Sequence, residues 1–138
     1  QRRIYVDGVF DLFHYGQIEL LIKIKKLFHN CHIIVGINKD EDINRYKNIS
    51  ILNQEEKVKT IKHCKYVDEI ITDTPWVINQ DFITKNKIDY VCHDPQPYKF
   101  NNMEDVYYFC KQNGIFIGIN RSPLISTSEI IRRVKTLR

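Results

Sequence analysis

The segment 6–17 holds the residue types in this chain that could handle phosphate groups. Gly8 follows a short β-rich run and lets the backbone turn tightly, and His14 and Gly16 stand where a helix should begin. The free N–H groups and partial positive charge of a helix N-terminus attract phosphates. The glycine patterns of dinucleotide-binding folds and of P-loops are both absent. A histidine beside a helix start is more often structural than catalytic, so this segment alone leaves both interpretations open.

Strand and helix patterns alternate along the rest of the chain. We expect strands at 4–6, 32–37, 67–71, 89–92 and 115–119, and helices at 15–28, 40–45, 53–63, 82–87, 104–113 and from 126 onward. The near-continuous apolar run 32–37 is typical of a parallel strand covered on both faces. Strands separated by helices imply right-handed crossovers. The sequence therefore predicts one α/β domain over residues 1–138, built on a single doubly wound parallel sheet.

The predicted sheet decides which segments can meet. In open α/β sheets, ligands bind beyond the carboxyl ends of the strands. Three segments then become candidates for a shared site: the turn after the first strand, the segment after the fourth strand and the approach to the last helix. Ser126 has good N-cap chemistry for that helix.

Composition narrows the class of protein. The chain has 138 residues, of which 43% are hydrophobic and 28% charged, so a packed core is expected. The net charge is +4, but the lysines and arginines are scattered, which argues against a nucleic-acid-binding surface. No apolar run approaches the ~18 residues of a membrane span. The four cysteines lie far apart without a C-x-x-C pair, which predicts free thiols in the cytoplasm and no metal site. The chain begins without a methionine, and we expect a domain of a longer protein.

Five motifs, in order, resemble those of cytidylyltransferases in the H-x-G-H nucleotidyltransferase superfamily, which have a Rossmann-like fold. The segment 7–16 matches D-G-x-F-D-x-x-H-x-G, and 65–69 is similar to R-Y-V-D-E. Pro75–Trp76 matches P-W. The segment 93–98 is similar to the H-D-x-x-P-Y of choline-phosphate cytidylyltransferases, and 121–127 stands where R-T-E-G-I-S-T is found. Together the matches cover almost the whole chain.

This resemblance implies in-line attack by a phosphate of the acceptor on the α-phosphorus of CTP, with release of pyrophosphate. Such chemistry depends on positioning and on donors aimed at phosphate oxygens. His14, Lys47 and Arg121 are the implied catalytic residues. Mg²⁺ is the implied cofactor, bridging phosphates of CTP. The implied CTP-binding residues are Gly8, Val9, Phe10, His14, Gly16, Gln17, Asp94, Arg121, Ile125, Ser126 and Thr127.

The resemblance also implies phosphocholine as the acceptor. A quaternary ammonium donates no hydrogen bond and is recognised by aromatic faces and carboxylates. The implied phosphocholine-binding residues are Asp11, Lys47, Trp76, Tyr98 and Tyr107. Ethanolamine phosphate is the alternative acceptor.

Several departures from the motifs open a second hypothesis. Gln17 replaces the second histidine of H-x-G-H, Lys57 replaces an arginine and Leu124 replaces a glycine. A neutral glutamine can donate a hydrogen bond but carries no charge. The domain is therefore either an active enzyme or a silent relative kept for nucleotide binding or regulation. The resemblance further implies a homodimer through residues 65–69, and nuclear or membrane association only through regions outside this sequence.

Overall fold

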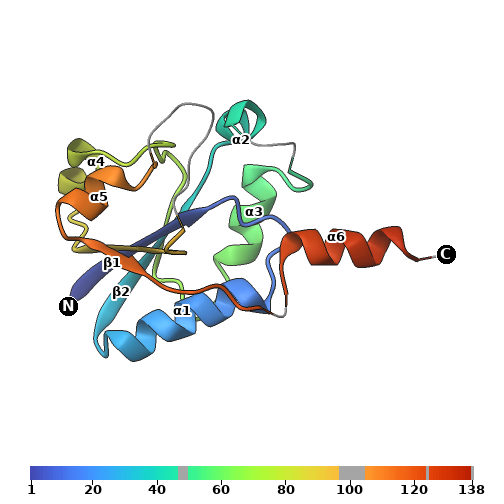
Figure 1. Cartoon of the computed structure of the whole chain (residues 1–138), viewed down its shortest axis with the longest axis horizontal. Coiled ribbons are helices and arrows are strands. Elements are labelled where there is room, and N and C mark those ends of the chain that lie inside the picture. Colours follow the sequence, from blue (N-terminus) through green and yellow to red (C-terminus); the bar gives the residue numbers. More distant parts are fainter. Residues whose placement is uncertain (47–49, 97–104, 124, 138) are drawn as a thin grey trace.

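The computed structural model describes residues 1–46, 50–96, 105–123 and 125–137. Within them lie the strands β1 (Arg2–Gly8), β2 (Cys31–Ile37), β3 (Glu69–Ile71), β4 (Tyr90–His93) and β5 (Phe116–Gly118). The helices are α1 (Tyr15–Leu27), α2 (Asp40–Tyr46), α3 (Gln54–Ile61), α4 (Gln80–Lys85), α5 (Tyr108–Gln112) and α6 (Thr127–Lys135). The strands form one sheet in the order β3-β2-β1-β4-β5, and every pairing is parallel. Figure 1 shows this sheet with helices around it.

The two faces of the sheet bury two separate cores. Alternate residues of β1 point to opposite faces, so Ile4 and Val6 pack with Leu21 and Ile24 of α1, while Tyr5 packs on the other side. The first core also takes in α3, and the second takes in α4 and α5. Both faces are thus covered, as the apolar run in β2 predicted, and the doubly wound α/β fold is confirmed.

Local capping explains most helix starts. Asn53 caps α3 and forms the predicted capping box with Glu56, because each side chain accepts the backbone N–H of the other residue. Asn79 caps α4 by accepting the N–H of Phe82 at 3.0 Å, so this helix begins two residues before its predicted start. Gly114 follows α5 with φ +68°, which confirms the predicted stop.

The predicted start of α5 was wrong. The prediction began at Glu104, which lies outside the described residues, whereas the helix begins only at Tyr108. Asp105 instead accepts the N–H of Tyr107 in a turn, and Tyr107 is 4% exposed. Burial of this turn against the sheet overrides the helical pattern of the sequence. The remaining boundaries of the predicted elements agree or differ by at most two residues.

Helix α6 has a different environment from the other helices. It extends away from the body of the molecule, and none of its residues is buried (Figure 1).

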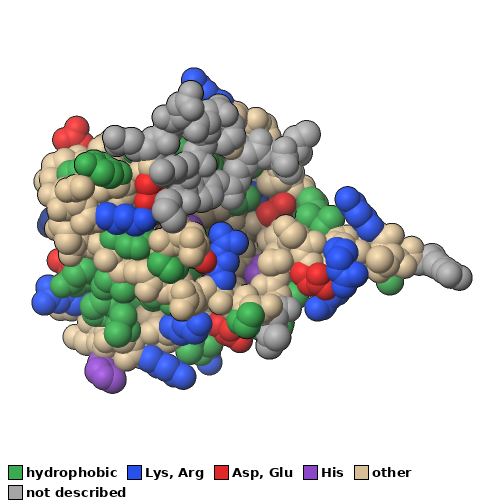
Figure 2. Space-filling view, in the orientation of Figure 1, with side chains coloured by type: hydrophobic (Ala, Val, Ile, Leu, Met, Phe, Trp, Pro, Cys, Tyr) green, Lys and Arg blue, Asp and Glu red, His purple; other side chains and the backbone are tan. Residues whose placement is uncertain are grey.

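On the face shown in Figure 2, lysine and arginine side chains are scattered rather than gathered in one stripe. No helix among the described residues is long and apolar enough to cross a membrane. All four cysteines are free thiols, and three of them are buried.

Candidate functional site

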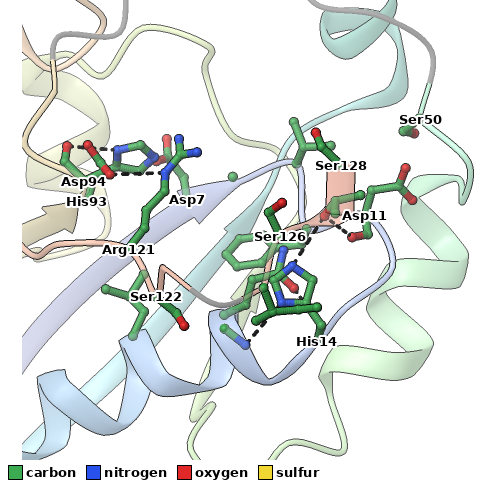
Figure 3. Close-up of a pocket in the computed structure, with 18 of the residues that line it drawn as sticks. Asp7, Asp11, His14, Ser50, His93, Asp94, Arg121, Ser122, Ser126 and Ser128 are labelled. Atoms are coloured by element: carbon green, nitrogen blue, oxygen red, sulfur yellow. Dashed lines mark hydrogen bonds and ion pairs between the residues drawn. The ribbon is translucent and has the colours of Figure 1, made fainter. Parts of the chain in front are cut away.

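A cavity of about 540 Å³ lies beyond the carboxyl ends of β1 and β4, where the N-termini of α1 and α6 meet. This volume falls in the range of roughly 300–1,000 Å³ that is usual for small-molecule sites. Figure 3 shows Arg121, Asp94 and Asp7 on one side of the cavity and His14, Asp11 and Ser126 on the other. The three segments that the predicted sheet was expected to bring together therefore line one site.

The loop between β1 and α1 carries unusual backbone geometry. Phe10 and Leu12 have φ angles of 52° and 50°, a left-handed conformation that L-residues with a side chain rarely adopt. Each such residue stores on the order of 1–3 kcal/mol, and such strain clusters at functional sites. Phe10 is also buried at 6% exposure, so core packing holds the loop in this shape.

His14 serves both the helix and the cavity. It is the N-cap of α1, and its Nδ1 accepts the backbone N–H of Gly16 at 3.1 Å. An accepting Nδ1 carries no proton, so the proton of the neutral ring lies on Nε2. Burial lowers the pKa of His14, which favours this neutral form. Nε2 is 3.5 Å from Oγ1 of Thr127, a long contact that leaves the N–H free to serve a ligand oxygen.

Gln17 completes the cap. Its Oε1 accepts the backbone N–H of His14 at 3.0 Å, which forms a capping box with the bond from Gly16 to the His14 ring. Because Oε1 is the acceptor, the amide NH₂ group is the part of Gln17 left to donate, and Gln17 lines the cavity. Gln17 thus supports His14 through its oxygen, and its NH₂ group is the part that can donate to a ligand.

Gly16 lets the two helix starts approach each other. A Cβ atom at Gly16 would lie 2.7 Å from Cγ2 of Ile125 and 3.1 Å from the His14 ring. A contact under 3.0 Å forces a shift, and Ile125 is itself buried at 8% exposure. Glycine is therefore needed here for close approach, and not for an unusual backbone angle.

The start of α6 supplies a second set of phosphate-type donors. Ser126 is the N-cap and accepts the N–H of Glu129 at 3.1 Å. Thr127 donates its hydroxyl to the backbone oxygen of Asp11 at 2.8 Å, which ties α6 to the loop after β1. The first N–H groups of a helix have no partner inside the helix. The starts of α1 and α6 border the same cavity, where a helix N-terminus favours an anion, while the N–H groups of Gly16 and Gln17 in α1 are already bonded to His14.

Arg121 reaches the cavity from the segment between β5 and α6. Its Nε is 3.1 Å from Oδ2 of Asp94, whose side chain is only 15% exposed, whereas the Arg121 side chain is 72% exposed. Asp94 also accepts the N–H of Gln96. The carboxylate is therefore anchored, and the exposed guanidinium retains further N–H donors for a phosphate.

A second, much smaller cavity of about 30 Å³ adjoins the first and shares Asp7, Gly8, Val9 and His93 with it. Trp76 and Tyr107 line this smaller cavity. The hydroxyl of Tyr107 donates to Asp7 at 2.7 Å, and burial together with the charge of Asp7 holds the pKa of Tyr107 well above its ordinary value. One face of Trp76 stacks on Tyr46 with ring centroids 5.1 Å apart.

His93 lies between these two cavities. Its ring packs on Tyr107 with centroids 4.6 Å apart, and burial lowers the pKa of His93 despite the nearby carboxylate of Asp7. A neutral ring carries one N–H donor and one acceptor nitrogen, and Nδ1 of His93 lies 3.3 Å from the backbone oxygen of Asp94.

The structure gathers most of the predicted site residues. The larger cavity is lined by Asp11 and by the whole predicted CTP-binding set: Gly8, Val9, Phe10, His14, Gly16, Gln17, Asp94, Arg121, Ile125, Ser126 and Thr127. The predicted phosphocholine group is divided, because Asp11 lines the larger cavity whereas Trp76 and Tyr107 line the smaller one. Lys47, Tyr98 and Leu124 lie outside the described residues. The binding roles of all these residues stay predictions.

Sequence reasoning missed other residues of the cavity wall. Asp7 was interpreted as part of a turn, although it shares a strand face with Tyr5, and the period-two pattern of β1 could have placed it inward. Ser50, Leu20, Ile43 and Ile131 also line the cavity. No local signal identified these, because only the folded arrangement brings them to the strand ends.

The expected dimer segment makes contacts within the chain. Asp68 accepts from Lys25 and from the backbone N–H of Ile33, and Glu69 pairs with Arg3. The carboxylates of Asp68 and Glu69 therefore both bind groups of the same chain. Dimerisation through this segment stays a prediction.

Comparisons with known proteins agree with this geometry. The family model described as "Cytidylyltransferase-like" matches residues 5–133. The chain is 42% identical over 132 residues to "Probable choline-phosphate cytidylyltransferase" of Schizosaccharomyces pombe. This alignment covers 96% of this chain and 36% of that protein. It is 33% identical over 134 residues to "Ethanolamine-phosphate cytidylyltransferase" of Mus musculus, covering 95% of this chain and 33% of that one. The chain thus spans about a third of the length of these relatives.

A solved structure shows the same fold. The lipopolysaccharide core biosynthesis protein from Thermoplasma volcanium GSS1 aligns with a TM-score of 0.64 and 24% sequence identity, over 88% of this chain and 96% of that one. The family match extends over nearly the whole chain, and it includes both helix starts that face the cavity. This chain belongs to the cytidylyltransferase-like family.

Proposed function

We propose that this domain transfers a cytidylyl group from CTP to phosphocholine. The observation that carries the proposal is the convergence of the N-termini of α1 and α6 on one cavity, where Nε2 of His14 lies 3.5 Å from Oγ1 of Thr127 in the cavity wall. Two helix starts, an imidazole N–H and a guanidinium form a site with the charge and the donors that a triphosphate requires.

The residues would act by positioning and by stabilising charge. A phosphate oxygen of phosphocholine would attack the α-phosphorus of CTP, so that one P–O bond forms while the bond to the β-phosphate breaks and pyrophosphate leaves. His14 would donate its Nε2–H to the charge that develops on the leaving group, and Arg121 would hold the phosphates. Fixed donors of this kind act where charge develops and need no rearrangement during the reaction.

Mg²⁺ is proposed to enter with the nucleotide, where it would offset the negative charge of the phosphates. Among the described residues, no group of three or more His, Cys, Asp or Glu side chains is placed to hold a metal ion.

Phosphocholine is favoured over ethanolamine phosphate as the acceptor by the relatives. Identity is 42% to a relative named for choline phosphate and 33% to one named for ethanolamine phosphate. Trp76, which lines the smaller cavity, is an aromatic side chain of the kind that a quaternary ammonium prefers, whereas Tyr107 is buried with its ring packed on His93 and Phe116.

The test is pyrophosphate release from CTP with each acceptor in turn and with none, followed by chromatography of the product. We expect release that depends on the acceptor, with phosphocholine at least about tenfold better in kcat/KM, since one good cation–π contact reaches ~2 kcal/mol. Release without acceptor, or a preference for ethanolamine phosphate, would contradict the proposal. Binding of CDP-choline without turnover, unchanged in a Gln17→His variant, would instead favour the silent domain.

A further inference from the structure

Asn38 is a buried polar residue that directly follows β2. Its backbone N–H donates to the backbone oxygen of Gly8 at 3.1 Å, which holds it beside the end of β1. The residue is 5% exposed, and it lines the smaller cavity of about 30 Å³. Ligands of open α/β sheets bind beyond the carboxyl ends of the strands, so Asn38 lies where a ligand can reach it.

The side-chain amide of Asn38 has no partner within the described part of the chain. Neither its oxygen nor its NH₂ group forms a hydrogen bond with any residue placed there. Buried polar side chains are bonded in the large majority of cases, and an unbonded one calls for a ligand, an ion or a water molecule. Because Asn38 lines the smaller cavity, a molecule in that cavity is the partner within reach of the amide.

The wall around this amide suits a cation. Asp7 is 5% exposed and accepts the hydroxyl of Tyr107 at 2.7 Å, and a carboxylate can accept several hydrogen bonds at once. Trp76 lines the same cavity, and an aromatic face attracts cations. Asp7 also lines the larger cavity, so an acceptor whose phosphate lies there can extend a cationic headgroup towards Asn38.

Headgroups differ in what they offer to the amide oxygen of Asn38. A quaternary ammonium has no N–H group, so it is attracted by an aromatic ring and a carboxylate but leaves the amide oxygen unpaired. The ammonium of ethanolamine phosphate carries N–H groups and can donate one of them. A buried acceptor that is left without its hydrogen bond is costly. Asn38 thus favours a headgroup with N–H groups, whereas Trp76 favours a quaternary one.

We propose that Asn38 is a specificity-determining residue for the headgroup of the acceptor. Its amide oxygen accepts an N–H of an ammonium headgroup and thereby reduces the advantage of phosphocholine over ethanolamine phosphate. The inference rests on the proposed function and adds to it a residue that opposes Trp76. Because specificity is a difference between two affinities, loss of the amide should widen the preference for phosphocholine.

The Asn38→Leu variant tests this role, because leucine keeps the branching of the side chain and removes its hydrogen-bonding atoms. The kcat/KM for ethanolamine phosphate should fall about ten- to a hundredfold, the value of a hydrogen bond to a charged group, while that for phosphocholine stays within about threefold. Equal effects on both acceptors, as expected if the amide holds only a water molecule, would overturn the proposal.

Two further variants separate hydrogen bonding from the size of the cavity. Asn38→Ala removes the amide and adds space, whereas Asn38→Asp keeps an oxygen acceptor at the same position. Asn38→Ala should match Asn38→Leu in the ratio of the two acceptors, and Asn38→Asp should lose much less activity with ethanolamine phosphate than either. If Asn38→Asp loses as much as Asn38→Ala, space rather than hydrogen bonding decides and the proposal is wrong.

The matched control is Asn30→Leu. Asn30 is exposed, directly precedes β2 at the opposite end from Asn38, and lines neither cavity. The same substitution there should leave the ratio of the two acceptors as in the wild type. A change as large as that of Asn38→Leu would show that the ratio does not report on the cavity.

Calorimetric titration with CDP-choline and CDP-ethanolamine gives a result that does not depend on turnover. In Asn38→Leu the Kd of CDP-ethanolamine should rise about tenfold or more, while that of CDP-choline stays within about threefold. If the wild-type chain turns over neither acceptor, the proposed function fails, and this shift in the ratio of Kd values would still uphold the role of Asn38. An unchanged ratio would refute that role even in an active enzyme. If neither compound binds the wild-type chain, both proposals fail.

Discussion

The two nitrogens of His14 face different partners, so one substitution can separate their roles. Nδ1 caps α1 by accepting the N–H of Gly16, and Nε2 faces the cavity 3.5 Å from Thr127. Asparagine is among the best N-cap residues, and Asn53 and Asn79 already cap helices in this chain. His14→Asn should therefore keep the cap and remove only the donor at the cavity.

The expected magnitudes follow from these contacts. Loss of one donor to the transition state costs about 2.7–4 kcal/mol, so kcat for His14→Asn should fall roughly a hundred- to a thousandfold. Its free energy of unfolding should change by less than about 0.5 kcal/mol. His14→Ala loses the cap as well, and its free energy of unfolding should fall by about 1 kcal/mol.

Two measurements on each variant check this reasoning: steady-state pyrophosphate release and urea denaturation. His29→Asn is the matched control, since His29 is exposed at the end of α1 and does not line the cavity. It should match the wild type in both measurements. The reasoning is refuted if His14→Asn keeps its rate within a few-fold, or if it destabilises the fold as much as His14→Ala does.

Three further predictions concern stability and are measured by urea denaturation. Gly36→Ala places a Cβ 2.0 Å from the hydroxyl oxygen of the fully buried Tyr5, and should cost about 3 kcal/mol or more; a loss under 1 kcal/mol would contradict this packing. Lys87→Gly relieves a φ of 52° just after α4 and should stabilise by about 1 kcal/mol, an effect that a neutral result would disprove. A hydrogen bond from His32 at 2.9 Å holds the pKa of Glu69 below its ordinary value. The stability that Glu69 contributes is therefore present above its unfolded pKa of about 4.3 and is lost as the pH falls below that value. Glu69→Gln should lower the free energy of unfolding by under about 1 kcal/mol at pH 7 and should not change it at pH 2. A difference that does not depend on pH would exclude this linkage.

The sequence by itself was enough to predict the helices and strands and their order along the chain. Apolar runs and apolar periodicity located the strands and α1, because burial on both faces of the sheet imposes that pattern directly on the residues, whereas N-cap residues marked the starts of α3 and α6. The cap at Asn53 and the stop at Gly114 were also readable, since each depends on contacts or backbone angles within a few residues.

Of the two misplaced helix starts, only that of α5 required the fold. The helical pattern before Tyr108 is overridden because Tyr107 is buried and bonds to Asp7, a hundred residues away in the chain. The cap at Asn79 is local and could have been found, since an asparagine three residues before Phe82 is an ordinary N-cap signal.

The site was only partly contained in the sequence. Its residues could be named because the motifs at 7–16, 93–94 and 121–127 resemble those of a family, and the sheet order explains why these segments meet at one edge. The resemblance could not say which way each side chain points. It assigned Asp11 to the acceptor, and the folded chain adds that this carboxylate accepts the backbone N–H groups of Ile51 and Leu52. Residue types set which hydrogen bonds are possible, but partners this distant in sequence are chosen only when the sheet and its helices bring them together.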